Sequence, residues 1–148
     1  MKTIILSTWF ALSTLQLLAQ SNLRKETAIN FYKDLIVRET NEDSIIVKYL
    51  YLQPTSVKSI RERNTYVKSI LQEVRRSGRA IDTLQLEVLE YDKVEPIPNL
   101  KLDQNRDEDI FALVKSDKVL SYILFKNDKI ESCIIIKKGD NMKYFLPF

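Results

Sequence analysis

The first half of the chain carries apolar residues at helical spacing. Residues 21–39 and 54–78 each place them three and four positions apart, which is typical of an amphipathic helix. The stripe of the first helix contains Ala28, Phe31, Tyr32, Leu35 and Ile36. Between the two helices, residues 41–54 begin with two good capping residues, Asn41 and Asp43, and continue with β-branched residues. We interpret them as a short helix that ends before Pro54.

The helix predicted within residues 54–78 has the clearest pattern of the three. Its apolar stripe consists of Val57, Ile60, Val67, Ile70, Leu71 and Val74. Gly78 is placed to end this helix in the left-handed conformation that glycine adopts readily. We therefore expect the helix that carries Ile60, Val67 and Leu71 to be the main packing element against a sheet.

After Gly78 the period of the pattern changes to two, which is typical of strands. Residues 82–94 alternate and then slip at Leu89 and Tyr91, which predicts a bulge. Four further strand candidates follow, at residues 109–117, 118–128, 129–140 and 141–148. Their separators, "SDK", "NDK" and "KGDN", are tight-turn compositions. The sequence thus predicts an α+β fold, with two or three N-terminal helices packed on a curled antiparallel sheet of four to five strands.

The strands of the second half carry apolar residues on both faces. Tyr122 and Leu124 alternate with Ile123 and Phe125, and Ile135 lies in the following apolar run. An antiparallel sheet that leaves one face to water is normally polar on that face. We therefore predict that Ile123, Phe125 and Ile135 line a second surface. Either curling of the sheet around a ligand-sized cavity covers this surface, or a second subunit or a protein partner does.

The longest irregular connection runs from residue 93 to residue 109. Within it, oxygen-bearing side chains alternate as they do at the start of a calcium loop, at Asp103, Asn105, Asp107 and Asp109. The resemblance to an EF-hand loop ends there. Glu108 stands where the glycine of the tight turn belongs, and Val114 where the bidentate Glu should be. A weak calcium site and a solvated acidic loop are the two interpretations.

Residues 1–19 have the pattern of a removable secretory signal. Lys2 precedes an uncharged, apolar-rich stretch, and Ala19 supplies a small residue at the cleavage point. A membrane anchor is the alternative, because the run from Thr3 to Asn22 carries no charge. With cleavage, residues 20–148 form a single α+β domain without a membrane span. We expect this domain in the periplasm or outside the cell, without a lipid anchor because no Cys lies near the cleavage point.

The composition of the chain limits the kinds of catalytic, metal and nucleic-acid sites that we expect. The chain of 148 residues contains no His, so the commonest general acid/base and the main zinc ligand are missing. Cys133 is the only cysteine and lies in an apolar run, where cysteine behaves as a small hydrophobe. The formal net charge is +3 with the two signs mixed, which does not indicate a nucleic-acid surface.

The order of elements, together with "INFYKDLI" in the first helix, resembles the NTF2-like α+β cone fold over about residues 23–148. The resemblance implies a pocket between helices and sheet. Some members are enzymes that use Asp-His or Asp-Tyr pairs, and many are small binding domains. Candidates to line such a pocket, or else to be ordinary core, are Tyr32, Tyr66, Tyr91 and Tyr122. A cystatin-like arrangement, with one helix wrapped by a sheet, is the alternative fold.

These observations favour a secreted, non-catalytic binding protein that uses a sheet face or a cone pocket. A pocket enzyme working with carboxylates and tyrosines is one alternative, and an inhibitor or immunity protein for another secreted protein is the other. The expected contact residues are Ile123, Phe125, Ile135, Tyr32 and Tyr122. A small apolar ligand, a second copy of the chain and a protein partner all remain open as occupants; no cofactor is expected.

Overall fold

The computed structural model describes residues 2–54, 60–79, 85–102, 106, 109–139 and 141–148, with side chains described at residue 16 and from residue 18 onward. Its helical elements are α1 (Lys2–Tyr32), the π-helical turn η1 (Lys33–Val37), α2 (Glu42–Tyr49), α3 (Ile60–Gly78) and the short 3₁₀ turn η3 (Tyr91–Lys93). Its strands are β1 (Glu87–Glu90), β2 (Ile110–Lys115), β3 (Lys118–Lys126), β4 (Lys129–Ser132), β5 (Ile135–Lys138) and β6 (Met142–Phe145).

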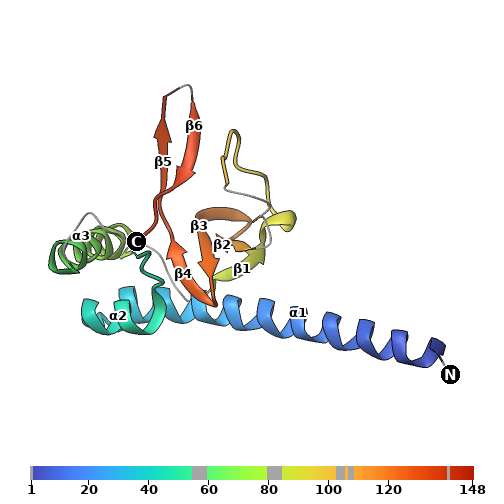
Figure 1. The fold of residues 1–148 in the computed structure, drawn as a ribbon. Helices are drawn as coiled ribbons and strands as arrows, with labels where there is room; N and C mark the ends of the chain where they lie inside the picture. Colours follow the sequence, from blue (N-terminus) through green and yellow to red (C-terminus); the bar gives the residue numbers. More distant parts are fainter. Residues whose placement is uncertain (1, 55–59, 80–84, 103–105, 107–108, 140) are drawn as a thin grey trace.

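The three helices predicted from the apolar stripes are present. α1 lies across one side of the sheet, and α2 and α3 lie near the C-terminal end of α1 (Figure 1). α2 begins where the sequence predicts, because the Asn41 side chain accepts a hydrogen bond of 2.8 Å from the backbone N–H of Asp43. Within the described residues, no helix combines the length and the apolar character that crossing a membrane requires.

The main sheet is antiparallel with the strand order β1-β2-β3-β4, so the predicted α+β class is confirmed. The tight turns are confirmed too. Ser116 and Asp117, and likewise Asn127 and Asp128, have the positive φ angles that two-residue hairpin turns need. The predicted bulge at residues 89–91 is wrong. β1 pairs with β2 in unbroken register, and the chain leaves the strand through η3 after Glu90.

The single strand predicted over residues 129–140 is two strands in different sheets. β4 belongs to the main sheet, whereas β5 pairs with β6 in a separate hairpin that projects away from α1 (Figure 1). Ser132 fixes the break between them. Its hydroxyl donates to the Leu146 carbonyl at 2.7 Å and accepts from the Ile134 N–H at 3.2 Å. Ile135 therefore lies outside the sheet that carries Ile123 and Phe125.

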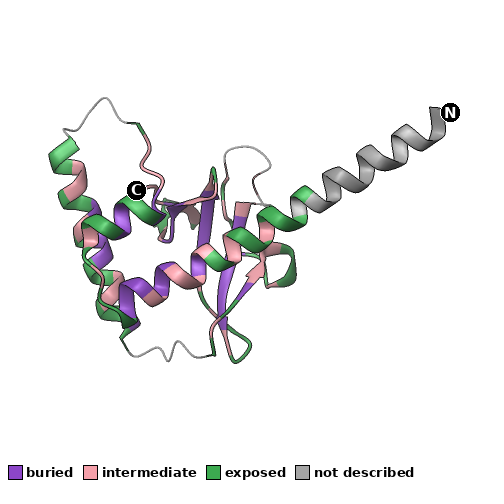
Figure 2. Ribbon diagram, turned by 90° about the horizontal axis from the view of Figure 1, so that it is seen from below, coloured by how far each residue is buried: buried purple, intermediate pink, exposed green. Residues whose placement is uncertain are grey.

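The main hydrophobic core lies between the helices and one face of the sheet. Buried residues gather where the C-terminal part of α1 meets the strands (Figure 2). The helices contribute Phe31, Leu35, Ile45 and Leu71, and the strands contribute Phe111, Ile123, Phe125 and Ile130. The prediction that Ile123 and Phe125 line a separately covered second surface is therefore wrong in placement, because both are fully buried under the helices.

A second, smaller core covers the opposite face of the sheet. It is formed by Ile97, Ile110, Leu124 and Phe145, with Tyr122 and Ile135 packed against it. Backbone hydrogen bonds of 3.0 and 2.9 Å join Lys143 of β6 to Asn99 and Lys101, so the connection after β1 and the last strand form one cover. The second face is thus closed by the chain itself, which explains the apolar residues on both faces.

The predicted stripe of α3 is right at its centre and wrong at Ile60, and Val57 lies outside the described residues. Val67 and Leu71 are fully buried, whereas Ile60 is 79% exposed at the first residue of the helix. Gly78 has a different role from the one predicted, since its φ is not left-handed and it is the last helical residue. A Cβ atom there would lie 2.3 Å from Cδ1 of Ile36, so glycine lets the end of α3 approach η1 closely.

Candidate functional site

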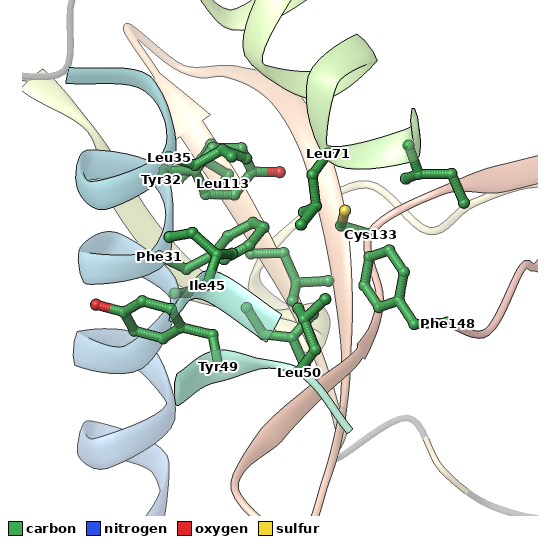
Figure 3. Close-up of a cluster of buried hydrophobic side chains, with 14 of the residues drawn as sticks. Phe31, Tyr32, Leu35, Ile45, Tyr49, Leu50, Leu71, Leu113, Cys133 and Phe148 are labelled. Atoms are coloured by element: carbon green, nitrogen blue, oxygen red, sulfur yellow. The ribbon is translucent and has the colours of Figure 1, made fainter. Parts of the chain in front are cut away.

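A pocket of about 640 Å³ opens between α3, the end of α1 and the main sheet. We call it the helix–sheet pocket. Its apolar lining comes from three sides, with Tyr32 on α1, Ile70 and Val74 on α3, and Leu113, Leu120 and Ile134 on or after the strands. Figure 3 shows the Tyr32 ring extending from α1 toward the side of the core where Leu71 and Cys133 lie. The pocket is therefore continuous with the main core.

A β-bulge shapes the sheet side of this pocket. Leu113 pairs with Ser121 and the next residue, Val114, pairs with Val119, so Leu120 is left as the extra residue of β3. A bulge re-aims side chains that a regular strand would send to opposite faces. Leu120 and Ser121 accordingly both line the pocket, although they are adjacent in sequence.

Two buried groups of the helix–sheet pocket, the Tyr32 phenol and the Cys133 thiol, are held in their neutral forms. Burial raises the pKa of the Tyr32 phenol well above its ordinary value, and the nearby Ser121 hydroxyl opposes this only in part. Burial likewise raises the pKa of the Cys133 thiol to about 12. A thiol that stays protonated is a poor nucleophile, so Cys133 contributes apolar lining and no reactive thiolate.

Glu73 is the one charged residue among the described residues that line the helix–sheet pocket. The Glu73 carboxylate is exposed and forms an ion pair of 2.7 Å with Arg76 on the next turn of α3. This arrangement suits the binding of an apolar molecule.

A second pocket, of about 890 Å³, lies between residues 18–24 of α1, the connection after β1, and β2. Most of its lining is apolar, and its charged side chains include Arg24, Glu90 and Asp109. Arg24 lies 2.9 Å from Asp109 and 3.2 Å from Asp128, and Lys25 lies 2.9 Å from Glu90. These pairs fasten α1 to the sheet.

The sequence-predicted contact residues do not form one site. Tyr32 lines the helix–sheet pocket, but Tyr122 and Ile135 belong to the second core on the other face of the sheet. The Tyr122 hydroxyl donates a 2.9 Å hydrogen bond to the Glu95 carbonyl, and its ring stands edge-on to Tyr91 with centroids 6.0 Å apart. Tyr122 thus anchors the connection that follows β1.

Of the four candidate calcium ligands, the structure places one. Asp109 is engaged by two guanidinium groups, Arg24 at 2.9 Å and Arg106 at 3.0 Å. Asp103, Asn105 and Asp107 lie outside the described residues. In the described part of the chain, no group of three or more His, Cys, Asp or Glu side chains is placed to hold a metal ion.

The apolar pattern of the sequence did not reveal a buried pair in the helical half, formed by Asp34 and Tyr49. Asp34 lies in η1 and accepts hydrogen bonds from the Tyr49 hydroxyl, from Lys48 at 3.0 Å and from Arg38 at 2.5 Å. The Tyr49 hydrogen bond contributes most to lowering the Asp34 pKa to about 2, with Lys48 and Arg38 adding to it against the effect of burial. Such a carboxylate is a weak base, and it does not line the helix–sheet pocket.

Glu131 is a second buried carboxylate that the pattern of the sequence did not reveal. It is the extra residue of the β3–β4 bulge and is only 1% exposed. The Gln53 side chain donates to it at 2.6 Å, and Arg106 lies 2.7 Å from its other oxygen. Its partner Gln53 lies 78 residues earlier in the chain and reaches Glu131 only through the tertiary fold. The residues next to Glu131 in the sequence therefore do not indicate that it is buried.

Comparison of the chain with models of protein families, with curated proteins and with solved structures finds no match in any of the three.

Proposed function

We propose that the protein is a non-catalytic binding protein that holds a small apolar molecule in the helix–sheet pocket. The observation that carries this proposal is the lining itself, in which apolar side chains from α1, α3 and the bulged sheet surround a few neutral hydroxyls. Small-molecule sites are typically concave and mostly apolar, with volumes of roughly 300–1,000 Å³. The pocket of about 640 Å³ falls within this range.

The place of the pocket supports an NTF2-like mode of binding. The NTF2-like resemblance implies a cavity between helices and a curled antiparallel sheet, and the helix–sheet pocket lies between these layers. The signal-like pattern of residues 1–19 supports action in the periplasm or outside the cell.

The pocket favours binding over the enzyme alternative. An enzyme of the NTF2-like kind would need an Asp-His or Asp-Tyr pair facing the substrate, and the Asp34–Tyr49 pair is tied to Lys48 and Arg38 away from the pocket lining. Capture of a partner through an uncovered sheet face loses its support too, because Ile110 and Leu124 on that face are buried in the second core.

Titration of the protein with the solvatochromic dye N-phenyl-1-naphthylamine tests the proposal. The dye fluoresces when it leaves water for an apolar site, so the protein should enhance its emission saturably. Leu120→Trp should weaken dye affinity at least about tenfold, since the larger ring fills the mouth of the pocket. Leu120 is 40% exposed, so the substitution can be made without disturbing the buried core.

Ile136→Trp is the matched control. Ile136 is 37% exposed on β5 and does not line the helix–sheet pocket, so this variant should bind the dye as the unaltered protein does. Absence of saturable binding, or equal loss of affinity in the two variants, would refute a ligand site at this place.

A further inference from the structure

The floor and the rim of the helix–sheet pocket differ in chemistry. Leu113 is fully buried, Tyr32 is 4% exposed and Cys133 is 9% exposed, so these side chains form the floor. Leu120 and Glu73 are much more exposed and form the rim. A molecule that enters the pocket therefore leaves water most completely at Tyr32 and Cys133.

Two hydroxyl groups meet at this floor. The Tyr32 phenol and the Ser121 hydroxyl both line the pocket. The Ser121 hydroxyl donates to the carbonyls of Tyr122 and Cys133, both at 3.4 Å, which is long for a hydroxyl hydrogen bond. A hydroxyl provides one donor and two acceptor lone pairs. The pair therefore retains capacity to donate to, or accept from, a polar group of a ligand.

A charged group on a ligand would meet no oppositely charged side chain among the described residues of this floor. The described lining contains no Lys or Arg, and its one carboxylate, Glu73, stands at the rim beside Arg76. Burying an ion without a partner costs several kcal/mol, far more than one neutral hydrogen bond returns. Because the Tyr32 phenol and the Cys133 thiol stay protonated, neither can balance a ligand cation.

We infer that the occupant of the helix–sheet pocket is an uncharged apolar molecule with a single polar group, which hydrogen-bonds to the Tyr32 and Ser121 hydroxyls at the floor while its apolar part contacts Ile70, Val74 and Leu113. A long-chain alcohol is the simplest molecule of this class. This inference rests on the proposed function and specifies the ligand class that the same pocket takes.

Competition between two ligands of equal chain length tests the inference. 1-Decanol and decanoate differ only at the polar end, and decanoate is charged at about pH 8. Decanol should displace N-phenyl-1-naphthylamine from the protein at a concentration at least about tenfold below that of decanoate. Equal or stronger displacement by decanoate would overturn the inference and leave the dye site itself intact.

Three variants locate the polar end of the ligand. Tyr32→Phe and, independently, Ser121→Ala should weaken decanol binding by roughly threefold to tenfold, the value of a neutral hydrogen bond, and should weaken it more than they weaken dye binding. Tyr122→Phe removes a phenol hydroxyl on the opposite face of the sheet. This variant should change neither the decanol affinity nor the dye affinity.

The two proposals fail in different ways. Failure of the dye to bind the unaltered protein refutes the pocket as a ligand site. Normal dye binding with unchanged decanol affinity in Tyr32→Phe and Ser121→Ala refutes only the placement of the polar group at the floor.

Discussion

Asp34 is a buried carboxylate that receives hydrogen bonds from three side chains, and its ionisation links stability to pH. Its pKa is lowered from 3.8 to about 2 in the folded chain, with the Tyr49 hydrogen bond as the largest cause. The native state thus binds this proton more weakly than the unfolded state does. The stabilisation is therefore complete above about pH 4 and is lost as the pH falls toward the folded pKa.

Asp34→Asn should lower the free energy of unfolding near neutral pH by roughly 1.5–3 kcal/mol, because hydrogen bonds to a charged acceptor are lost. It should also flatten the fall in stability between about pH 4 and pH 2. Urea denaturation at several pH values measures both effects. Asp43→Asn is the control, since Asp43 is an exposed partner of Lys68 and its loss should cost no more than about 1 kcal/mol. Equal losses in the two variants would contradict the role assigned to Asp34.

Local chemistry was enough to predict some single residues and not others. The Asn41 cap and the turn at Asn127–Asp128 depend on a few neighbouring residues, and the structure confirms both. Asp34 lies in a helical stretch where an acidic residue is normally solvated, and only the approach of Tyr49 from α2 makes it a buried acceptor. Its partners come from the tertiary fold, which the pattern of the sequence does not contain.

Among the elements, α3 connects the core to the helix–sheet pocket. Val67 and Leu71 point into the main core, and Ile70 and Val74 on the adjacent side of the helix line the pocket. Periodicity predicted this stripe, but it gave the same weight to Ile60, which the structure leaves in solvent. The period of a helix identifies an apolar side, whereas the length over which that side is covered depends on what lies opposite.

Leu71→Ala should destabilise the protein by roughly 2–5 kcal/mol, because the truncated side chain leaves a cavity between the helices and the sheet. Ile60→Ala on the same helix should change stability by no more than about 0.5 kcal/mol, since it removes no buried contact. Equilibrium denaturation with circular dichroism detection gives both values. A loss below about 0.5 kcal/mol for Leu71→Ala would mean that another side of α3 packs on the sheet.

The sheet shows the same limit of sequence patterns. Alternation correctly predicted strands within residues 109–117, 118–128, 129–140 and 141–148. It could not tell which face of the strands meets the helices, because both faces are apolar and both are buried. The division between β4 and β5 was missed for a related reason, since the hydrogen bond that fixes it joins Ser132 to Leu146, 14 residues later.

In the whole molecule, α1 spans the predicted signal and the predicted mature domain without a break. Figure 1 shows it extending past the sheet toward the N-terminus. Side-chain hydrogen bonds from α1 to the sheet occur at Gln20, which donates to Asp128 at 3.1 Å, and at Ser21, which donates to Glu90 at 2.5 Å. Both residues follow the predicted cleavage point, so cleavage after Ala19 would leave these contacts in place.

Intact-mass measurement of the exported protein tests this boundary. We expect the mass of a chain that begins at Gln20. Such a chain keeps the residues Gln20, Ser21 and Arg24 that contact the sheet. A mass that includes Met1 would show that the segment is retained, in agreement with the membrane-anchor alternative.

The two cores are each completed by residues near the end of the numbered sequence. Phe145 closes the second core, and Phe148 is buried in the main one, where its N–H donates to the Glu131 carbonyl at 2.9 Å. Ribosomes make a chain from its N-terminus, so every other member of both cores is synthesised before these two phenylalanines. During translation, both faces of the sheet therefore lack part of their cover until residues 145–148 have emerged from the ribosome.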